Sequence, residues 1–515
     1  MKTVNNRRVG ILISYIYTAA NAVVQLIYVP LLIGSIGQDE YGLYQLIGSI
    51  LAYIVSISGV LSAGVGRFYC KYLAEGDLDR AENTLAISRR IFWAVSAVAL
   101  AVVAVLACTF RGVYGASFTA EQVNECIAML IVLGINACVT MNNTVSIAAI
   151  TAHERFVFLK LSSLAVLLLQ PVLVIFLVRF FPNALTVTLV VLALNAACAL
   201  IQGIYSRRAL GVGKAYLGWD SRLARGILTF SGTVVLAIIA DQIFWKTDQL
   251  IVGYMFGASS VAVYAVGAQI YQAYMSVGTA ASALFLPRIS ALVHKDHDMQ
   301  GMSDLFVRFG RLNGLLLLFL LGGFAVFGQD FIAMWVGEGY FDSYLVALIV
   351  MVPYTIDLVQ CLGITYLQAI DRYRFRATMH LACAVLNIFL TFVFLCVWGL
   401  PGAAASTAIS TFVGNGLIMN WYYWKKEGLD IPRFWKEVAR VTAPAAVAAA
   451  VVGLAYHTLP FRHAEAPSFA VGCLAYGVLF AVLEWRFGMN EREKGLVVSA
   501  LEKLAKRGDS QVEAK

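Results

Sequence analysis

Three charged side chains, Asp241, Lys246 and Asp248, stand in a stretch that is otherwise suited to lipid, DQIFWKTDQLIVGYMFG (residues 241–257). At 100° per residue of helix, all three charges fall on one half of the circumference, together with Gln242, Trp245 and Gln249. A charge that faces lipid at the bilayer centre costs at least about 2.5 kcal/mol. The pattern therefore indicates a helix that borders a polar cavity, or an ion pair between Lys246 and either acid, and the two are not exclusive.

A further acid, Asp357, lies in another apolar segment and needs either a partner or a proton there. Asp241, Asp248 and Asp357 are therefore the candidates for binding Na⁺ or H⁺. The sequence contains no G-x-x-x-x-G-K-[ST] loop for ATP. For the lone amides in apolar segments, such as Gln360 and Asn415, we expect hydrogen bonds between helices.

These residues must be positioned by membrane-spanning helices. Of the 515 residues, 60% are hydrophobic and only 13% are charged, and the mean hydropathy is +0.77; soluble domains carry about one quarter charged residues. The first apolar run, residues 9–36, is too long for a signal-peptide core and is expected to remain as a helix. The nine cysteines are scattered without a Cys-x-x-Cys pair, so we expect free thiols and neither a disulfide framework nor a metal site.

Apolar runs of about 20 residues, enough to cross a bilayer, occur about fourteen times. Their approximate ranges are 10–35, 43–66, 91–110, 125–150, 157–179, 185–205, 227–256, 259–286, 313–334, 344–368, 377–398, 402–424, 438–459 and 467–486. With the N-terminus inside, only Arg111, Arg179 and Arg462 of the 38 Lys and Arg residues fall in outer connections. This bias places both termini in the cytoplasm, and it accounts for the net charge of +8 without nucleic acid.

Two longer inner connections, residues 68–88 and 286–309, space their apolar residues for one helical face. They are interpreted as short amphipathic helices at the cytoplasmic interface, with a solvated loop as the alternative.

The sequence contains an internal repeat. AHERFVF at residues 152–158 recurs as AIDRYRF at 369–375, 217 residues later, and Tyr44 has a counterpart in Tyr264. A duplicated unit with an even number of helices keeps both copies in the same orientation, as in transporters with parallel repeats. We therefore expect an all-α integral membrane protein with an N-terminal lobe of six helices (1–224), a second lobe of six (225–424), two appended helices (425–486) and a cytoplasmic tail (487–515).

Three motifs stand in this framework: Pro30-x3-Gly34-x6-Tyr41-Gly-Leu-Tyr44, Asp248-x4-Gly253-x3-Gly257-x6-Tyr264, and Trp335-Val-Gly-Glu-Gly339. Together with the layout of six, six and two helices, they resemble the O-antigen and teichoic-acid type polysaccharide flippases of the multidrug/oligosaccharidyl-lipid/polysaccharide (MOP) exporter superfamily. The resemblance covers essentially the whole chain. It implies two pseudo-symmetric six-helix bundles around a central cavity, through which a lipid-linked oligosaccharide moves from the inner to the outer leaflet of the bacterial cytoplasmic membrane.

The resemblance also implies roles for particular residues. Lipid-linked oligosaccharides carry a pyrophosphate, and the family's proposed mechanism uses a cationic cavity to accept this headgroup. Lys246 and, at the inner mouth, Lys160, Arg374 and Arg376 could supply the positive charge, although the positive-inside rule also explains the residues at the mouth. Trp245, Gln242 and Gln249 complete the candidate cavity lining, with aromatic rings such as Trp245 and Tyr264 either stacking on sugars or packing.

For a transporter of this kind, Na⁺ or H⁺ bound at Asp241, Asp248 or Asp357 would couple transport to an ion gradient by alternating access. Because the sequence has no ATP-binding loop, we expect the energy to come from such a gradient or from an imbalance between substrate and product.

Other functions remain open from the sequence. A drug or metabolite cation antiporter of the same fold is the nearest alternative, but such exporters usually have only twelve helices. A lipid II-type flippase is another alternative; these flippases have fourteen helices, but their characteristic Arg-Asp opening is missing here. A scaffold or pore without transport is a further alternative. The outer loops are too short for a membrane-embedded glycosyltransferase or polymerase, so we expect no enzyme activity and no cofactor. The expected partners are the lipid-linked oligosaccharide, membrane lipids, Na⁺ or H⁺, and the polymerase and glycosyltransferases of lipopolysaccharide or capsule synthesis.

Overall fold

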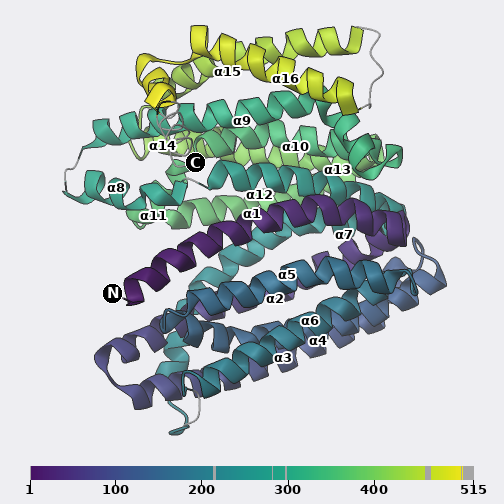
Figure 1. The fold of residues 1–515 in the computed structure, drawn as a ribbon, viewed down its shortest axis with the longest axis vertical. Coiled ribbons are helices and arrows are strands. Elements are labelled where there is room, and N and C mark those ends of the chain that lie inside the picture. The colour runs from purple at the N-terminus through teal and green to yellow at the C-terminus, as the bar shows by residue number, and fades with distance from the viewer. Residues whose placement is uncertain are drawn as a thin grey trace, which may run out of the picture. The chain divides into compact units, whose positions relative to one another are not determined.

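The fold is seen in a computed structural model, which describes residues 2–212, 216–280, 282–295, 298–458, 466–499 and Glu502. This part of the chain is built from helices and short connections, without strands (Figure 1). It divides into two compact units, Met1–Ala265 and Val266–Lys515. The boundary between these units lies later than the one expected between duplicated lobes at 224/225, which stays a prediction.

The first unit holds six helices and most of a seventh: α1 (Lys2–Ile36), α2 (Gln38–Glu75), α3 (Leu78–Tyr114), α4 (Ala120–Ala152), α5 (Phe156–Val178), α6 (Ala184–Arg208) and the start of α7 (Ser221–Thr279). Within it α4 packs against α2, α3 and α6, and α5 packs against α1 and α6. Side chains close several helix ends: Asp77 accepts from the Arg80 amide at 3.0 Å, and Thr119 and Gln122 form a capping box. These caps satisfy backbone donors that would otherwise lack a partner.

The second unit continues with α8 (Leu286–Ser290), α9 (Met299–Val336), α10 (Phe341–Val359), α11 (Leu362–Ala369), α12 (Tyr373–Trp398), α13 (Leu400–Thr411), α14 (Met419–Lys425), α15 (Ile431–Thr458) and α16 (Ala466–Leu483). Short π-helical segments join α13 to α14 and follow α16. The helix pair α15 and α16, yellow in Figure 1, packs against α9. The two appended helices expected from the sequence thus belong to the second unit.

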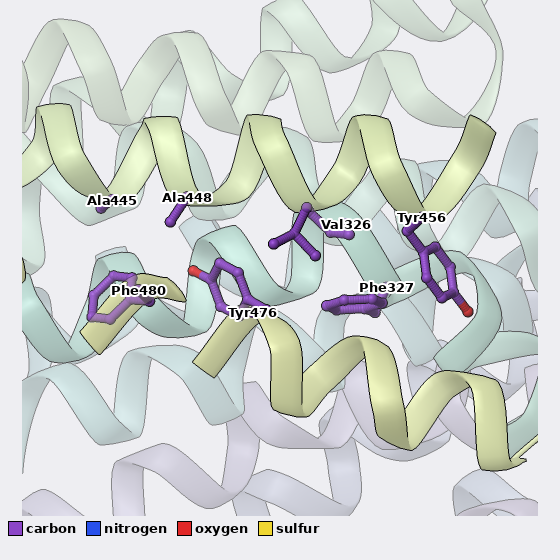
Figure 2. Packing of buried hydrophobic residues seen from close by; sticks show 8 residues of the cluster. Val326, Phe327, Ala445, Ala448, Tyr456, Tyr476 and Phe480 are labelled. Atoms are coloured by element: carbon purple, nitrogen blue, oxygen red, sulfur yellow. The ribbon is translucent and has the colours of Figure 1, made fainter. Parts of the chain in front are cut away.

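A cluster of buried side chains holds α9, α15 and α16 together (Figure 2). Phe327 packs edge-on against Tyr456 with ring centroids 4.9 Å apart, and the Tyr476 hydroxyl donates to the Phe319 carbonyl at 3.0 Å. Ala445 and Ala448 let α15 approach closely. In lipid the hydrophobic effect does not drive helices together, so small residues, dispersion contacts and hydrogen bonds of this kind supply the association.

The described residues contain twelve helices that are long and apolar enough to span a membrane. One of these, Ile238–Thr279, contains two of the expected spans, because α7 turns at Gly257, whose φ is 81° and ψ −174°. A straight helix would separate Asp248 from Tyr264, 16 residues away, by about 24 Å. The hydroxyl of Tyr264 lies 2.8 Å from the Asp248 carboxylate, so the chain reverses at Gly257.

The remaining expected span, 402–424, corresponds to α13, a π-helical segment and α14, which together run from Leu400 to Lys425. The two halves of α7 and this interrupted run bring the twelve to the fourteen expected. The amphipathic helix expected at residues 68–88 is wrong as a separate element: Phe68–Glu75 continues α2, and Leu78 begins α3. The one at 286–309 is partly correct, since the short α8 precedes α9.

The internal repeat is visible in the backbone. Glu154 and Asp371, at matching positions of the repeated motif, are the two described non-glycine residues with positive φ, at 56° and 57°. Behind each turn an aromatic pair stacks, Phe158 on Tyr205 at 3.8 Å and Phe375 on Tyr422 at 4.0 Å. Both rings of the second pair lie 217 residues after those of the first. Equal turns and equal stacks at one offset support duplication of the helical unit.

Candidate functional site

The charged segment of α7 is fixed at one end by the reversal at Gly257. The combination of φ 81° and ψ −174° is open essentially to glycine alone, so this residue sets where the helix ends. Gly37, between α1 and α2, has nearly the same conformation, with φ 87° and ψ 169°. Residues 241–256 therefore form the last turns of a span that ends at a reversal.

Polar side chains connect this span to α2 within the first unit. Tyr53 and Thr247 hydroxyls lie 2.6 Å apart, and Ser49 donates to the side-chain oxygen of Gln249. Gln249 is only 3% exposed, so its amide serves a contact between helices. Its expected contact with substrate stays a prediction.

Further along the same span, backbone carbonyls of α7 accept hydrogen bonds from the last residue of α3 and from the turn that follows it. The Tyr114 hydroxyl donates to the Leu250 carbonyl at 3.3 Å, and Ser117 donates to the Tyr254 carbonyl. Residues 247–254 are thus held from two sides. The contacts give this part of α7 a fixed register against α2 and α3.

Asp248 is buried, with 2% of its surface exposed, and accepts a hydrogen bond from the Tyr264 hydroxyl at 2.8 Å. These residues are the first and last of the second motif, so the motif closes on itself through the reversal at Gly257. Tyr264 is fully buried. In this structure it packs and donates, and its ring offers no face to a sugar.

Lys246 lies on a different side of the helix from this contact. Its side chain is half-buried, as are those of Gln242 and Trp245, whereas Asp241 is exposed. Among the described residues, no carboxylate forms an ion pair with Lys246, so the structural pair with Asp241 or Asp248 is not formed. The charged residues of the segment therefore divide between a buried acid bound to tyrosine and a cation that no described acid neutralises.

Asp357 and Arg376 form a second site, within the second unit. They belong to α10 and α12, and the guanidinium Nη2 lies 3.8 Å from the carboxylate Oδ2. Both side chains are shielded, with 7% and 14% exposed. Asp357 is thus paired with Arg376, a residue expected from the sequence to contact the substrate. The neighbouring Arg374 is exposed.

Lys160 occupies a third environment. Its ammonium lies 5.2 Å from the centre of the Tyr17 ring, which joins α5 to α1 within the first unit. This distance suits a cation–π contact. Tyr17, Ser49 and Tyr53 are partners that sequence reasoning missed, because a tyrosine or serine in an apolar run carries no signal of what it will meet.

The hydrogen bond to another segment that was expected of a lone amide is present at Gln360, whose side chain donates to the backbone carbonyl of Asn415 at 2.7 Å. A further cluster was not anticipated from the sequence: Arg311 binds Glu493, Glu437 and the Gly488 carbonyl. Its members come from three segments far apart in the chain.

Comparison with known proteins adds to this geometry. A family model described as polysaccharide biosynthesis protein matches residues 8–293. A putative O-antigen transporter from Shigella flexneri is 22% identical over 228 residues, which cover 44% of this chain and 52% of the relative. The chain therefore matches about half the length of that curated relative.

Solved structures show the same fold at low identity. The lipid II flippase MurJ, in an inward closed conformation, has a TM-score of 0.74 at 12% identity, with 92% of this chain and 98% of that chain covered. An inward-facing multidrug resistance MATE transporter of the MOP superfamily has a TM-score of 0.66 at 13% identity, with 81% and 96% covered. Since the family model spans more than half of the 515 residues, the chain belongs to the polysaccharide biosynthesis protein family, and it has the fold of MOP-superfamily transporters.

Proposed function

We propose that the protein moves a lipid-linked oligosaccharide from the inner to the outer leaflet of the bacterial cytoplasmic membrane. The observation that carries this proposal is the match to a polysaccharide biosynthesis family over residues 8–293 of a chain with a transporter fold. The O-antigen transporter named among its relatives points to the same substrate class.

Lys246 is the proposed contact for the pyrophosphate. It is a half-buried cation on a span, and no described carboxylate neutralises it. An ammonium in such a place gains most from an anionic ligand, because the low dielectric strengthens the attraction between them. Trp245 and Gln242, beside it on α7 and likewise half-buried, are proposed to contact the first sugar.

Asp357 and Arg376 are proposed to couple transport to an ion. When Asp357 takes up a proton, the pair loses its attraction, and Arg376 becomes available to an anionic group together with the neighbouring Arg374. Lys160 remains a separate candidate contact for the pyrophosphate. Asp241 and Asp248 remain the other coupling candidates. Transport would then proceed by alternating access without a cofactor.

Deletion of the gene in its native host tests this function. We expect loss of surface polysaccharide together with accumulation of lipid-linked intermediates on the inner leaflet. Complementation with the wild-type chain is the control and should restore both. Normal polysaccharide combined with raised sensitivity to cationic dyes would contradict the proposal and indicate a drug exporter, whereas blocked peptidoglycan synthesis would indicate a lipid II flippase.

A further inference from the structure

A cavity of about 810 Å³ lies within the second unit, apart from every residue assigned above to the substrate or the ion. Its walls come from α8, α9, α15 and the helical residues 491–499 of the tail. Five arginines from these separate segments converge on it: Arg288, Arg308, Arg311, Arg433 and Arg492. We call it the basic cavity.

Arg311 lines the basic cavity, but its guanidinium group has no hydrogen left to donate to a ligand. Its Nε and Nη2 donate to the two carboxylate oxygens of Glu493 at 2.7 and 2.8 Å, and Nη2 also donates to the Gly488 carbonyl. Its Nη1 donates to the carbonyl and the carboxylate of Glu437. All five guanidinium hydrogens are therefore used, and a side chain only 3% exposed ties the tail to α9 and α15.

Each of the four acids that line the cavity has a partner within the protein. Glu437 and Glu493 bind Arg311, Asp304 pairs with Arg433 at 2.7 Å, and Asp298 accepts from the Gly301 amide at the start of α9.

The remaining arginines of the lining are Arg288, Arg308 and Arg492. All three are exposed, and among the described residues none of them pairs with a carboxylate. Five arginines against four acids give the lining a net charge of +1, and these three guanidinium groups are the ones that no described acid pairs with. Positive-inside bias explains arginines on this face of the protein, but it does not require four segments to direct them into one cavity.

Apolar groups lie beside the basic ones. Leu312 is 38% exposed and lines the cavity, and the uncharged stretch of α9 begins there. Leu496, also in the lining, is 55% exposed, and the adjacent Val497 and Val498 are exposed too. A lipid at the membrane interface has a charged headgroup next to apolar acyl chains. Basic side chains beside apolar residues at the start of a span suit both parts of such a lipid.

We propose that the basic cavity binds the headgroup of an anionic phospholipid. Its volume lies within the range of about 300–1,000 Å³ that is usual for ligand sites, and arginines near a cytoplasmic membrane surface attract anionic lipid. Arg288, Arg308 and Arg492 bind the phosphate, and the apolar residues contact the first part of the acyl chains. This site is independent of the oligosaccharide that the protein transports.

The test uses the purified full-length protein in neutral detergent, with short-chain phosphatidylglycerol as probe and phosphatidylcholine of equal chain length for comparison. Native mass spectrometry gives the apparent affinity of each lipid. The wild type should prefer phosphatidylglycerol. The combined variant Arg288→Gln, Arg308→Gln, Arg492→Gln should bind it on the order of a hundredfold more weakly, from roughly fivefold per arginine.

A matched control removes the same charge elsewhere. Arg80→Gln, Arg208→Gln, Arg222→Gln replaces three exposed arginines of inner connections in the first unit and should keep wild-type affinity. If the combined cavity variant is poorly recovered, Arg308→Gln alone should still lose roughly fivefold. Equal loss in both triple variants, equal binding of the two lipids, or displacement of phosphatidylglycerol by inorganic phosphate at matching concentration would each overturn the proposal.

Discussion

At the scale of single residues, Lys246 poses the sharpest question, because its ammonium group is too far from the end of the span to reach water at the membrane interface. From Lys246 to the reversal at Gly257 is about 16 Å of helix at 1.5 Å per residue, whereas a lysine side chain reaches only roughly 6 Å toward an interface. The ammonium must therefore be compensated within the protein. No carboxylate among the described residues pairs with it, and we propose that water and an anionic substrate compensate its charge.

Replacement of Lys246 is the first prediction at this scale. Lys246→Arg should retain polysaccharide export, while Lys246→Ala should lose most of it and Lys246→Glu all of it, because each removes or reverses the charge that the pyrophosphate meets. Surface polysaccharide in a complemented deletion strain measures this, with membrane abundance checked for each variant. Lys71→Glu, a charge reversal at an exposed position of α2, is the control and should export normally.

The same assay distinguishes an ion-pair role for Lys246. A buried charge left by removing its partner is destabilising, and neutralising that charge as well restores function. Since neither acid pairs with Lys246, adding Asp241→Asn or Asp248→Asn to Lys246→Ala should restore nothing. Full activity of Lys246→Ala by itself would end the proposed contact with substrate.

Tyr264 gives a prediction about stability. Tyr264→Phe removes one hydrogen bond that the buried Asp248 accepts and should cost about 1–3 kcal/mol, the range for a hydrogen bond to a charged group. Its repeat counterpart offers a control: no hydrogen bond of the Tyr44 hydroxyl is found among the described residues, so Tyr44→Phe should be close to neutral. Thermal unfolding of the detergent-solubilised protein compares the two, and equal shifts would contradict a special role for Tyr264.

The sequence predicts which side chains in the spans need a polar partner better than it predicts which residue that partner is. The rule that an acid inside a span must be compensated correctly required a partner for Asp357. That the partner is Arg376, and that Asp248 meets Tyr264, depends on how helices rotate and pack, which periodicity does not determine. Gln249 illustrates the limit: its position on the polar half of the helix was clear from the sequence, but its hydrogen bond with Ser49 of α2 was not.

At the scale of elements, the helix reversals are the best-specified features. The motif repeated 217 residues apart has the same left-handed residue in each copy, so similar local sequence gives the same turn. The aromatic stack behind each turn joins the motif to a tyrosine outside it. At residues 68–88 the prediction of a separate helix was wrong, because amphipathic spacing is the same in a separate helix and in the end of a long one. Only the short break at Gly76 separates α2 from α3, with φ 76° closing the first helix.

Gly37 and Gly257 allow a prediction at this scale. Both occupy a backbone region that other residues enter only with strain, so Gly37→Ala and Gly257→Ala should each destabilise the protein by about 1–3 kcal/mol. Gly48→Ala, in α2 with nothing within 4 Å of the added methyl group, should be neutral or stabilising. Thermal unfolding measures all three, and a neutral Gly257→Ala would show that the reversal does not depend on this conformation.

At the scale of the whole molecule, hydropathy and charge bias predicted the number of spans, because the bilayer imposes one length on every helix. The span expected at 402–424 is helical in the structure, although a π-helical segment interrupts it. What composition could not predict is the set of contacts that join distant segments, such as those of Arg311 with Glu437 and Glu493. Such clusters depend on tertiary packing, and in this chain they shape the basic cavity.

The last prediction concerns the direction of the spans. Reporter fusions at Gly115 and Glu338 should report the outside, and fusions at Asp77, Gly218, Asp298 and the C-terminal tail the inside; Glu465, also expected outside, lies beyond the described residues. Each of the described fusion sites stands at a helix end or in a connection, so a fusion there interrupts no span.

Asp298 and Glu338 test the reversal at Gly257 directly. If the long α7 crossed the membrane only once, every later segment would be inverted, with Asp298 outside and Glu338 inside. The hydrogen bond between Asp248 and Tyr264 requires the chain to fold back between them, and the positive-inside bias requires the same, since Arg288, Arg308 and Arg311 would otherwise face outward. Agreement at Asp77, Gly115 and Gly218 with reversal at Asp298, Glu338 and the C-terminal tail would therefore contradict the hairpin in α7. Two or more reversals in any other combination would overturn the topology as a whole.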